Sequence, residues 1–134
     1  MNRKLKRFTV LTATQVKQKV LVIEDNIDGA ESLWSALDLL GYDARVAHNG
    51  ADGLQLAEDF RPDAILLDVG LPDMGGYQVA QQLRATSWGK DIYLIAATGW
   101  SQFEVKEVAF KAGCDFHIVK PIDLMELDGI MKGL

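Results

Sequence analysis

The chain contains the stretch Val20-Leu21-Val22-Ile23-Glu24-Asp25, in which two acids directly follow a short apolar run. Such a run, bounded by polar residues, is typical of a strand buried on both faces of a sheet. The same arrangement returns three times, with apolar runs that end at Asp68, at Thr98 and at Lys120. Parallel strands bring their carboxyl ends to one edge of the sheet, where such sheets bind ligands. The sequence therefore predicts that polar side chains from four separate segments meet at one edge.

Segments with helical spacing lie between the apolar runs. In the first of them, apolar residues recur every three or four positions and form one continuous apolar stripe, made of Ile27, Ala30, Leu33, Trp34, Leu37 and Leu40. We expect a short strand at 45–47 and further helices at about 50–58, 76–84, 101–112 and 123–131. Five β-α repeats predict an α/β fold, the doubly wound, flavodoxin-like (βα)5 arrangement with five parallel strands in the order 2-1-3-4-5. This order places its switch point between the first and third strands, which end in the acids.

Length and charge limit the possible classes of protein. The 134 residues fit one domain, and the single Cys114 excludes a disulfide within the chain. The first 19 residues hold six basic and no acidic residues, whereas the other 115 hold eight basic and 19 acidic ones. An acidic body argues against nucleic acid as the main partner, and no apolar stretch approaches the ~20 residues that span a bilayer. We expect a cytoplasmic domain over 19–134 after a basic tail or linker at 1–18, for which a membrane-surface or nucleic-acid arm is the alternative.

The residues at the predicted edge indicate phosphoryl chemistry. Three carboxylates in contact repel one another, and a hard divalent cation such as Mg²⁺ relieves that repulsion. A lysine and a hydroxyl beside such a cation are suited to binding phosphate oxygens, and an aspartate can itself form an aspartyl-phosphate. Taken singly, Glu24-Asp25 is equally explained as a solvated strand end, Thr98 as part of a turn and Lys120 as a strand stop. Their combination favours a site, with Asp68 as its nucleophile.

Four motifs in this order and spacing resemble the receiver domain of two-component response regulators. They are Leu21-Val22-Ile23-Glu24-Asp25-Asn26, Leu66-Leu67-Asp68-Val69-Gly70-Leu71-Pro72-Asp73-Met74-Gly75-Gly76, Ala97-Thr98-Gly99 and Val119-Lys120-Pro121. The resemblance covers about residues 19–134. It is closest to the receivers of hybrid sensor histidine kinases, judged by Glu24-Asp25-Asn26 and by residues 115–121.

The resemblance implies a role for each matching acid. Asp68 would be the phosphoacceptor and would take a phosphoryl group from a histidine of a partner kinase or histidine phosphotransfer domain. Asp25 and Asp68 would bind Mg²⁺ directly, and Glu24 would do so directly or through water. The backbone carbonyl of Gly70 would be the third protein ligand. The implied protein is a signalling phosphoacceptor that catalyses only its own phosphoryl transfer and dephosphorylation.

Further roles follow from the resemblance for the last two strands. Lys120 would pair with the phosphoryl group, and the Lys120-Pro121 peptide bond would be cis. Thr98 would donate to the phosphoryl oxygens and move its loop inward. The switch position three residues before the lysine usually carries Tyr or Phe, but here it carries His117. Either His117 fills aromatic space as a partly exposed side chain, or it changes rotamer together with Thr98 and adds pH sensitivity.

The region after Thr98 carries an expected interaction surface. Trp100 is expected either to cover the phosphoryl site as a lid or to lie outward on the fourth helix. On that helix, Val105, Val108, Ala109 and Ala112 fall in one sector that we expect to face the sheet. Phe103 and Phe110 fall opposite and would form a partner or homodimer surface on the face of the fourth helix, fifth strand and fifth helix. A rotated helix, with these phenylalanines buried, is the alternative.

Rival functions make distinct demands on the sequence. An aspartate-nucleophile phosphohydrolase needs a second acid two residues after the nucleophile, where this chain has Gly70. A flavin carrier needs a phosphate loop after the first strand, where two acids stand instead. A receiver-fold interaction module that works without phosphorylation remains the other alternative. Only one helix fits after Lys120, so we expect no DNA binding within this chain.

Overall fold

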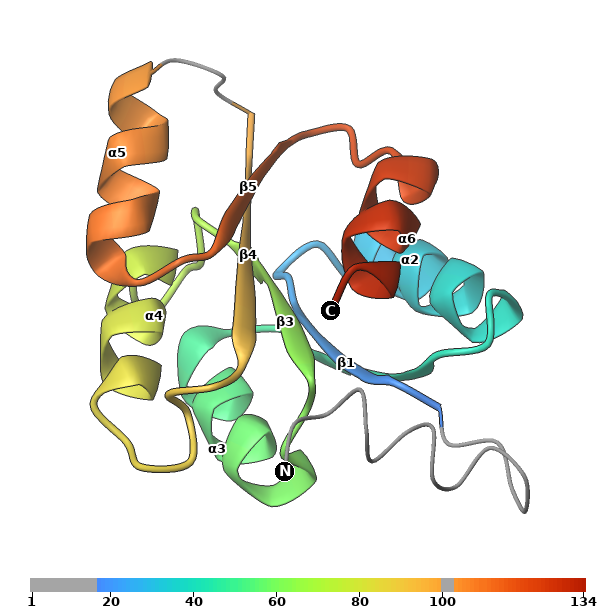
Figure 1. The fold of residues 1–134 in the computed structure, drawn as a ribbon, viewed down its shortest axis with the longest axis horizontal. Helices are drawn as coiled ribbons and strands as arrows, with labels where there is room; N and C mark the ends of the chain where they lie inside the picture. Colours follow the sequence, from blue (N-terminus) through green and yellow to red (C-terminus); the bar gives the residue numbers. More distant parts are fainter. Residues whose placement is uncertain (1–16, 100–102) are drawn as a thin grey trace.

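Five strands alternate with five helices in the computed structural model (Figure 1). It describes residues 17–99 and 103–134, with the backbone alone for residues 103–105. The strands are β1 (Lys19–Ile23), β2 (Asp43–Ala47), β3 (Ala64–Asp68), β4 (Tyr93–Thr98) and β5 (Phe116–Val119). The helices are α2 (Ile27–Leu39), α3 (Gly50–Phe60), α4 (Gly76–Arg84), α5 (Phe103–Ala112) and α6 (Leu124–Lys132). None of the helices within these ranges is long and apolar enough to cross a bilayer.

The strands form one parallel sheet in the order β2-β1-β3-β4-β5, which confirms the predicted topology. Ile23 lies opposite Leu67, so Glu24, which directly follows β1, lies beside Asp68 at the end of β3. Thr98 lies opposite Val119, so Lys120 follows directly beyond it. The register therefore brings the carboxyl ends of β1, β3, β4 and β5 to the same edge.

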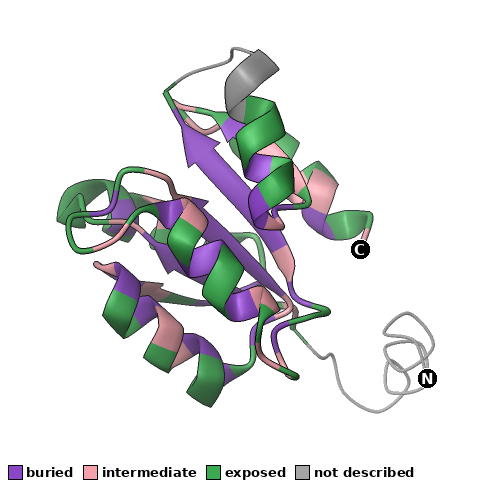
Figure 2. Cartoon of the chain, turned by 90° about the vertical axis from the view of Figure 1, so that its left-hand side faces the viewer, coloured by how far each residue is buried: buried purple, intermediate pink, exposed green. Residues whose placement is uncertain are grey.

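Helices cover both faces of the sheet (Figure 1). Residues of α3, α4 and α5 pack on one face against the side chains of Leu21, Ile65 and Leu94. Residues of α2 and α6 pack on the other face against Val22, Leu66 and Ile95. Neighbouring residues along each strand thus enter opposite cores, which explains why the central strands are apolar throughout. Figure 2 shows these buried strands in purple beneath helices whose outer faces are green.

The ends of the elements follow local signals in the sequence. Asn26, Asn49 and Asp123 cap α2, α3 and α6 by accepting hydrogen bonds from backbone amides of the first turn. Gly41 follows α2 with a φ of 94°, a conformation that favours glycine. The strand expected at 45–47 begins two residues earlier, and the helices expected to end near residues 58 and 131 extend to Phe60 and Lys132. The expected start of the fourth helix, at Ser101, lies outside the described residues.

The apolar stripe that begins on α2 is buried only in part. Ala30 and Leu37 are fully buried, but Ile27, Leu40 and Trp34 are 57%, 48% and 41% exposed. A helix that lies on a sheet buries a narrower arc than its apolar positions span, because only the residues closest to the strands lose contact with water. The indole N–H of Trp34 donates to the backbone carbonyl of Ala44 at 2.8 Å, so this ring lies along the edge strand β2.

The predicted orientation of α5 is correct at its centre and wrong at Val108. Ala109 and Ala112 are buried, and Phe110 is 56% exposed, as expected. Val108 was expected to face the sheet, yet it is 47% exposed. It lies 100° around the helix from Ala109, and small alanines let only a narrow strip of the helix approach the sheet.

Candidate functional site

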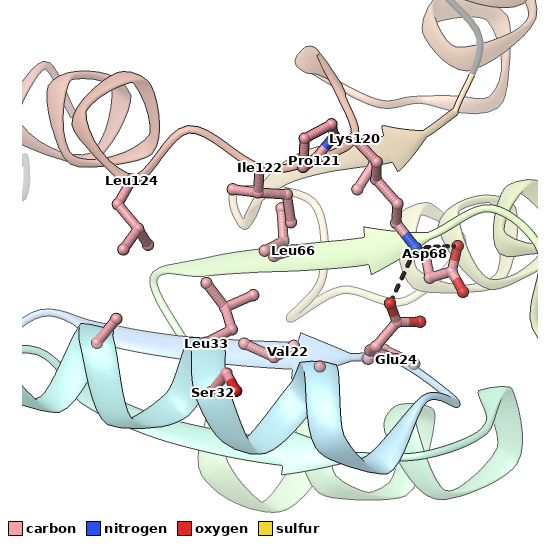
Figure 3. Close-up of a pocket in the computed structure, with 14 residues that line it drawn as sticks. Val22, Glu24, Ser32, Leu33, Leu66, Asp68, Lys120, Pro121, Ile122 and Leu124 are labelled. Atoms are coloured by element: carbon pink, nitrogen blue, oxygen red, sulfur yellow. Dashed lines mark hydrogen bonds and ion pairs between the residues drawn. The ribbon is translucent and has the colours of Figure 1, made fainter.

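Lys120 stands between two carboxylates from different strands (Figure 3). Its Nζ lies 2.9 Å from Oε1 of Glu24, which follows β1, and 3.1 Å from Oδ1 of Asp68, which ends β3. The two carboxylates and the ammonium are 16%, 12% and 31% exposed, so all three groups are partly withdrawn from water. The structure therefore brings together side chains that are 96 residues apart in sequence.

A third carboxylate, that of Asp25, completes an acidic cluster. Each of Glu24, Asp25 and Asp68 offers an oxygen, and these atoms lie within 4.8 Å of one another. Asp25 is exposed to solvent. Oε2 of Glu24 is buried and has no hydrogen-bond partner among the residues that the structure describes. An all-oxygen donor set with an unpaired buried oxygen and one ammonium for three carboxylates fits a hard divalent cation.

The surroundings of Glu24, Asp68 and Lys120 shift the pKa of each of these groups. Burial, together with the neighbouring Asp68, raises the pKa of Glu24 from 4.5 to about 7, although Lys120 opposes this rise. Burial would also raise the pKa of Asp68, but its contacts with Glu24, the Gly70 amide and Lys120 lower it. Burial would lower the pKa of Lys120, but the two carboxylates raise it. Without a metal ion, the Glu24 and Asp68 carboxylates therefore share a proton that is lost only near neutral pH and is held mainly by Glu24.

Asp68 is followed by a loop that turns back over the edge of the sheet. The amide of Gly70 donates to Oδ1 of Asp68 at 3.2 Å, and the amide of Gly76 donates to the carbonyl of Val69 at 2.9 Å. A Cβ on Gly76 would lie 2.5 Å from the carbonyl oxygen of Asp68, so this close return requires glycine. The proposed ligand role of the Gly70 carbonyl remains a prediction.

The last two strands bring the backbones of Thr98 and Lys120 side by side. Thr98 ends β4 and is 5% exposed, and its carbonyl accepts a hydrogen bond from the amide of Lys120 at 2.7 Å. The Lys120-Pro121 peptide bond is cis. Thr98 thus stands one strand away from Asp68, on the side from which Lys120 enters the acidic cluster.

His117 shares a face of the sheet with Thr98. It lies opposite Ala96, two residues before Thr98, and alternate residues of a strand point to the same face. Both ring nitrogens are buried and have no hydrogen-bond partner in the described part of the chain. Burial lowers the pKa of His117, and Lys106 lowers it further. Phe116 packs into the opposite core, where its ring lies 6.1 Å from that of Tyr93.

The three aromatic residues expected near the switch are only partly described. Trp100 and the side chain of Phe103 lie outside the described residues. Phe110 points to solvent on α5, and the exposed Val108 on the same helix and Val119 on β5 add to the apolar surface of this side.

Sequence reasoning missed a pocket that opens beside the acidic cluster. It has a volume of about 300 Å³ and lies between α2 and the segment that leads into α6 (Figure 3). Small residues of α2, Gly29, Ser32 and Ala36, form one wall, and Pro121 and Ile122 form part of the other. The spacing of the small residues on one side of a helix was the available signal, but only the fold shows what they face.

Known proteins share this fold and its sequence pattern. The family model described as the response regulator receiver domain matches residues 20–132. The response regulator MprA of Mycobacterium tuberculosis is 34% identical over 116 residues, which are 87% of this chain and 50% of MprA. The chain therefore spans about half the length of the curated relatives it matches.

Two solved structures show the same likeness. The chemotaxis response regulator CheY4 of Vibrio cholerae has a TM-score of 0.83 at 27% identity, over 89% of this chain and 100% of that one. The receiver domain of the sensor histidine kinase PA1611 from Pseudomonas aeruginosa, with a magnesium ion in its active-site cleft, has a TM-score of 0.80 at 30% identity. That match covers 88% of this chain and 97% of the receiver. The chain belongs to the response regulator receiver domain family of two-component signalling systems.

Proposed function

We propose that this chain is a cytoplasmic phosphoacceptor of a two-component phosphorelay. Asp68 would accept a phosphoryl group from a phosphohistidine of a histidine kinase or a histidine phosphotransfer domain. The observation that carries the proposal is the contact of Lys120 with both Glu24 and Asp68 inside a cluster of three carboxylates. This arrangement provides a nucleophile, a cation for phosphoryl oxygens and the oxygen donors for Mg²⁺.

The residues of the site have separate roles in the transfer. A carboxylate oxygen of Asp68 attacks phosphorus, the P–N bond to the donor imidazole breaks, and the imidazole nitrogen keeps the electron pair and takes a proton. Lys120 moves from its contact with the Asp68 carboxylate onto the phosphoryl oxygens, and Thr98 donates a hydrogen bond to them. Glu24, Asp25, Asp68 and the Gly70 carbonyl would hold Mg²⁺. When bound, Mg²⁺ supplies positive charge against the phosphoryl oxygens.

The phosphorylated form would change a protein-interaction surface. Phosphorylation replaces the Asp68 carboxylate by a bulkier dianion, and Thr98 and Lys120 respond to it. Thr98 ends β4 and Lys120 directly follows β5, the two strands that α5 covers on one face and α6 on the other, and His117 shares the face of Thr98. We therefore propose that output to a target protein or to a second copy of the chain passes through α5, β5 and α6, including Phe110 and, by the sequence pattern, Phe103 and Trp100.

Acetyl phosphate provides a test that needs no cognate kinase. Transfer of its phosphoryl group to Asp68 releases acetate and leaves an acyl phosphate that is stable in acid and labile in base. Intact-protein mass spectrometry should show one added phosphoryl group in the wild type with Mg²⁺, and none with EDTA or in Asp68→Asn. If the wild type gains no phosphoryl group under these conditions, the chain works as an interaction module without phosphorylation.

A further inference from the structure

The loop after Asp68 is fastened to a different part of the domain by the side chain of Asp73. Oδ1 of Asp73 accepts a hydrogen bond from the amide of Gly50 at 2.7 Å, and Oδ2 accepts one from the amide of Ala51 at 2.9 Å. These amides open α3, and the first amides of a helix have no partner within the helix. Asp73 therefore caps α3 from a loop that lies 22 residues further along the chain.

Packing reinforces this connection. Gly50 is buried, and a Cβ at this position would lie 2.4 Å from Cγ of Met74, the neighbour of Asp73. The tip of the loop thus lies directly against the start of α3. The segment that leads into α3 also contacts the chain just after β1, because Nδ1 of His48 lies 3.0 Å from the backbone oxygen of Glu24.

The β2–α3 corner (residues 48–51) is thereby in contact with both chain segments that supply the acidic cluster. It touches the backbone of Glu24 through His48 and the loop of Asp68 through Asp73. Between Asp68 and Asp73 lies Gly70, whose amide already donates to the Asp68 carboxylate. The backbone of Gly70 is consequently held on one side by its own hydrogen bond to the Asp68 carboxylate and on the other by the hydrogen bonds of Asp73 to the start of α3.

We infer that Asp73 is a positioning residue, which fixes the Gly70 segment of the loop against the start of α3 and so sets the affinity of the acidic cluster for Mg²⁺. This inference rests on the proposed function, because it assigns a cation to the cluster. A carboxylate is well suited to this position, because the two amides lie at the positive end of the helix dipole. Hydrogen bonds from these two amides lower the pKa of Asp73, so its carboxylate stays ionised near neutral pH.

Asn49 offers a matched control for the test. Its side chain caps the same end of α3 by accepting from the amide of Asp52 at 2.8 Å, but its bonding partner is within α3 rather than in the Asp68 loop. Asn49→Ala and Asp73→Ala should both destabilise the start of α3. Only Asp73→Ala should also release the loop. Asp73→Asn, which keeps one acceptor oxygen, should fall between Asp73→Ala and the wild type.

The experiment measures Mg²⁺ affinity by calorimetry and the Gly70 amide resonance by NMR in metal-free protein. We expect Asp73→Ala to weaken Mg²⁺ binding threefold or more and to shift the Gly70 resonance, whereas Asn49→Ala should change the affinity by less than 1.5-fold. Equal Mg²⁺ affinities in Asp73→Ala and Asn49→Ala would overturn the inference. A wild type that binds no Mg²⁺ would refute the proposed function itself, and the inference with it.

Discussion

Replacing Glu24 with glutamine should separate the two effects that its carboxylate has on the protein. In the absence of a cation, this carboxylate is buried beside Asp68 and has one oxygen without a hydrogen-bond partner among the described residues. Its charge therefore costs stability. With Mg²⁺ bound, the same carboxylate would serve as a ligand under the proposed function. We expect Glu24→Gln to stabilise the metal-free protein and to reduce the stabilisation that Mg²⁺ provides.

The raised pKa gives the size and the sign of the first effect. A rise from 4.5 to about 7 means that folding favours the protonated carboxyl, so its contribution to stability is complete below pH 4.5 and is lost as the pH rises through 7. The full shift corresponds to about 3 kcal/mol at 1.36 kcal/mol per pKa unit. Since Glu24 keeps some contact with water and with Lys120, we expect its ionisation to lower the free energy of unfolding by only about 1–2 kcal/mol.

Urea denaturation between pH 5 and 8.5 measures this difference directly. In EDTA, the free energy of unfolding of the wild type should fall by about 1–2 kcal/mol more than that of Glu24→Gln across this range. Glu31→Gln, which removes an exposed acid from α2, should keep the slope of the wild type. In excess Mg²⁺ the wild type should regain its stability at high pH and Glu24→Gln should gain less. Parallel slopes for wild type and Glu24→Gln in EDTA would refute the reasoning.

Three further substitutions probe neighbouring parts of the site and its surroundings. Lys120→Met should lower the free energy of unfolding in EDTA by about 1–2 kcal/mol, because Glu24 and Asp68 lose the ammonium group that they share. Lys120→Arg should restore most of this free energy. Equal free energies of unfolding for Lys120→Met and the wild type in urea denaturation would contradict this. His117→Phe should raise stability by about 1 kcal/mol at pH 8, because it removes two buried ring nitrogens that have no hydrogen-bond partner among the described residues. Since burial and Lys106 lower the pKa of His117, the wild type should lose further stability as the pH falls below 6.5, whereas thermal melts of His117→Phe should lack this component; an identical acid limb in both proteins would exclude His117 as its source. Phe110→Ser should leave the free energy of unfolding within about 0.5 kcal/mol of the wild type, because the side chain is 56% exposed, and should weaken self-association of the phosphorylated protein in sedimentation velocity; a large loss of stability would place Phe110 in the core.

The order of elements could be predicted from the sequence because each central strand is a short apolar run buried on both faces. The runs that end at Ile23 and Leu67 have no alternation of polar and apolar residues, which is the mark of a strand covered by helices on both sides. The gathering of Glu24, Asp68 and Lys120 follows from the same feature, since parallel register aligns the carboxyl ends. The structure brings these three side chains within contact distance.

Contacts between distant loops could not be predicted in this way. Arg84 donates to the carbonyls of Gly89, Ile92 and Gly113 and pairs with Asp115 at 2.8 Å, and Asp73 binds the amides that open α3. Nothing local in the sequence names these partners, because the relative position of the loops is set only when the helices pack. The exposure of Ile27, Trp34 and Val108 could not be predicted from the sequence for a related reason. Periodicity shows which face of a helix is apolar, but the width of the buried strip depends on what lies beneath it.

The proposed phosphoacceptor role of Asp68 is tested best by locating the residue that carries the phosphoryl group. After reaction with acetyl phosphate and Mg²⁺, borohydride reduces an aspartyl phosphate to homoserine and releases phosphate, and peptide mass spectrometry then locates the modified residue. We predict homoserine at position 68 alone, and none when Mg²⁺ is replaced by EDTA. Homoserine at position 25 or 73, or an unmodified aspartate at position 68 in protein that has gained a phosphoryl group, would contradict this role.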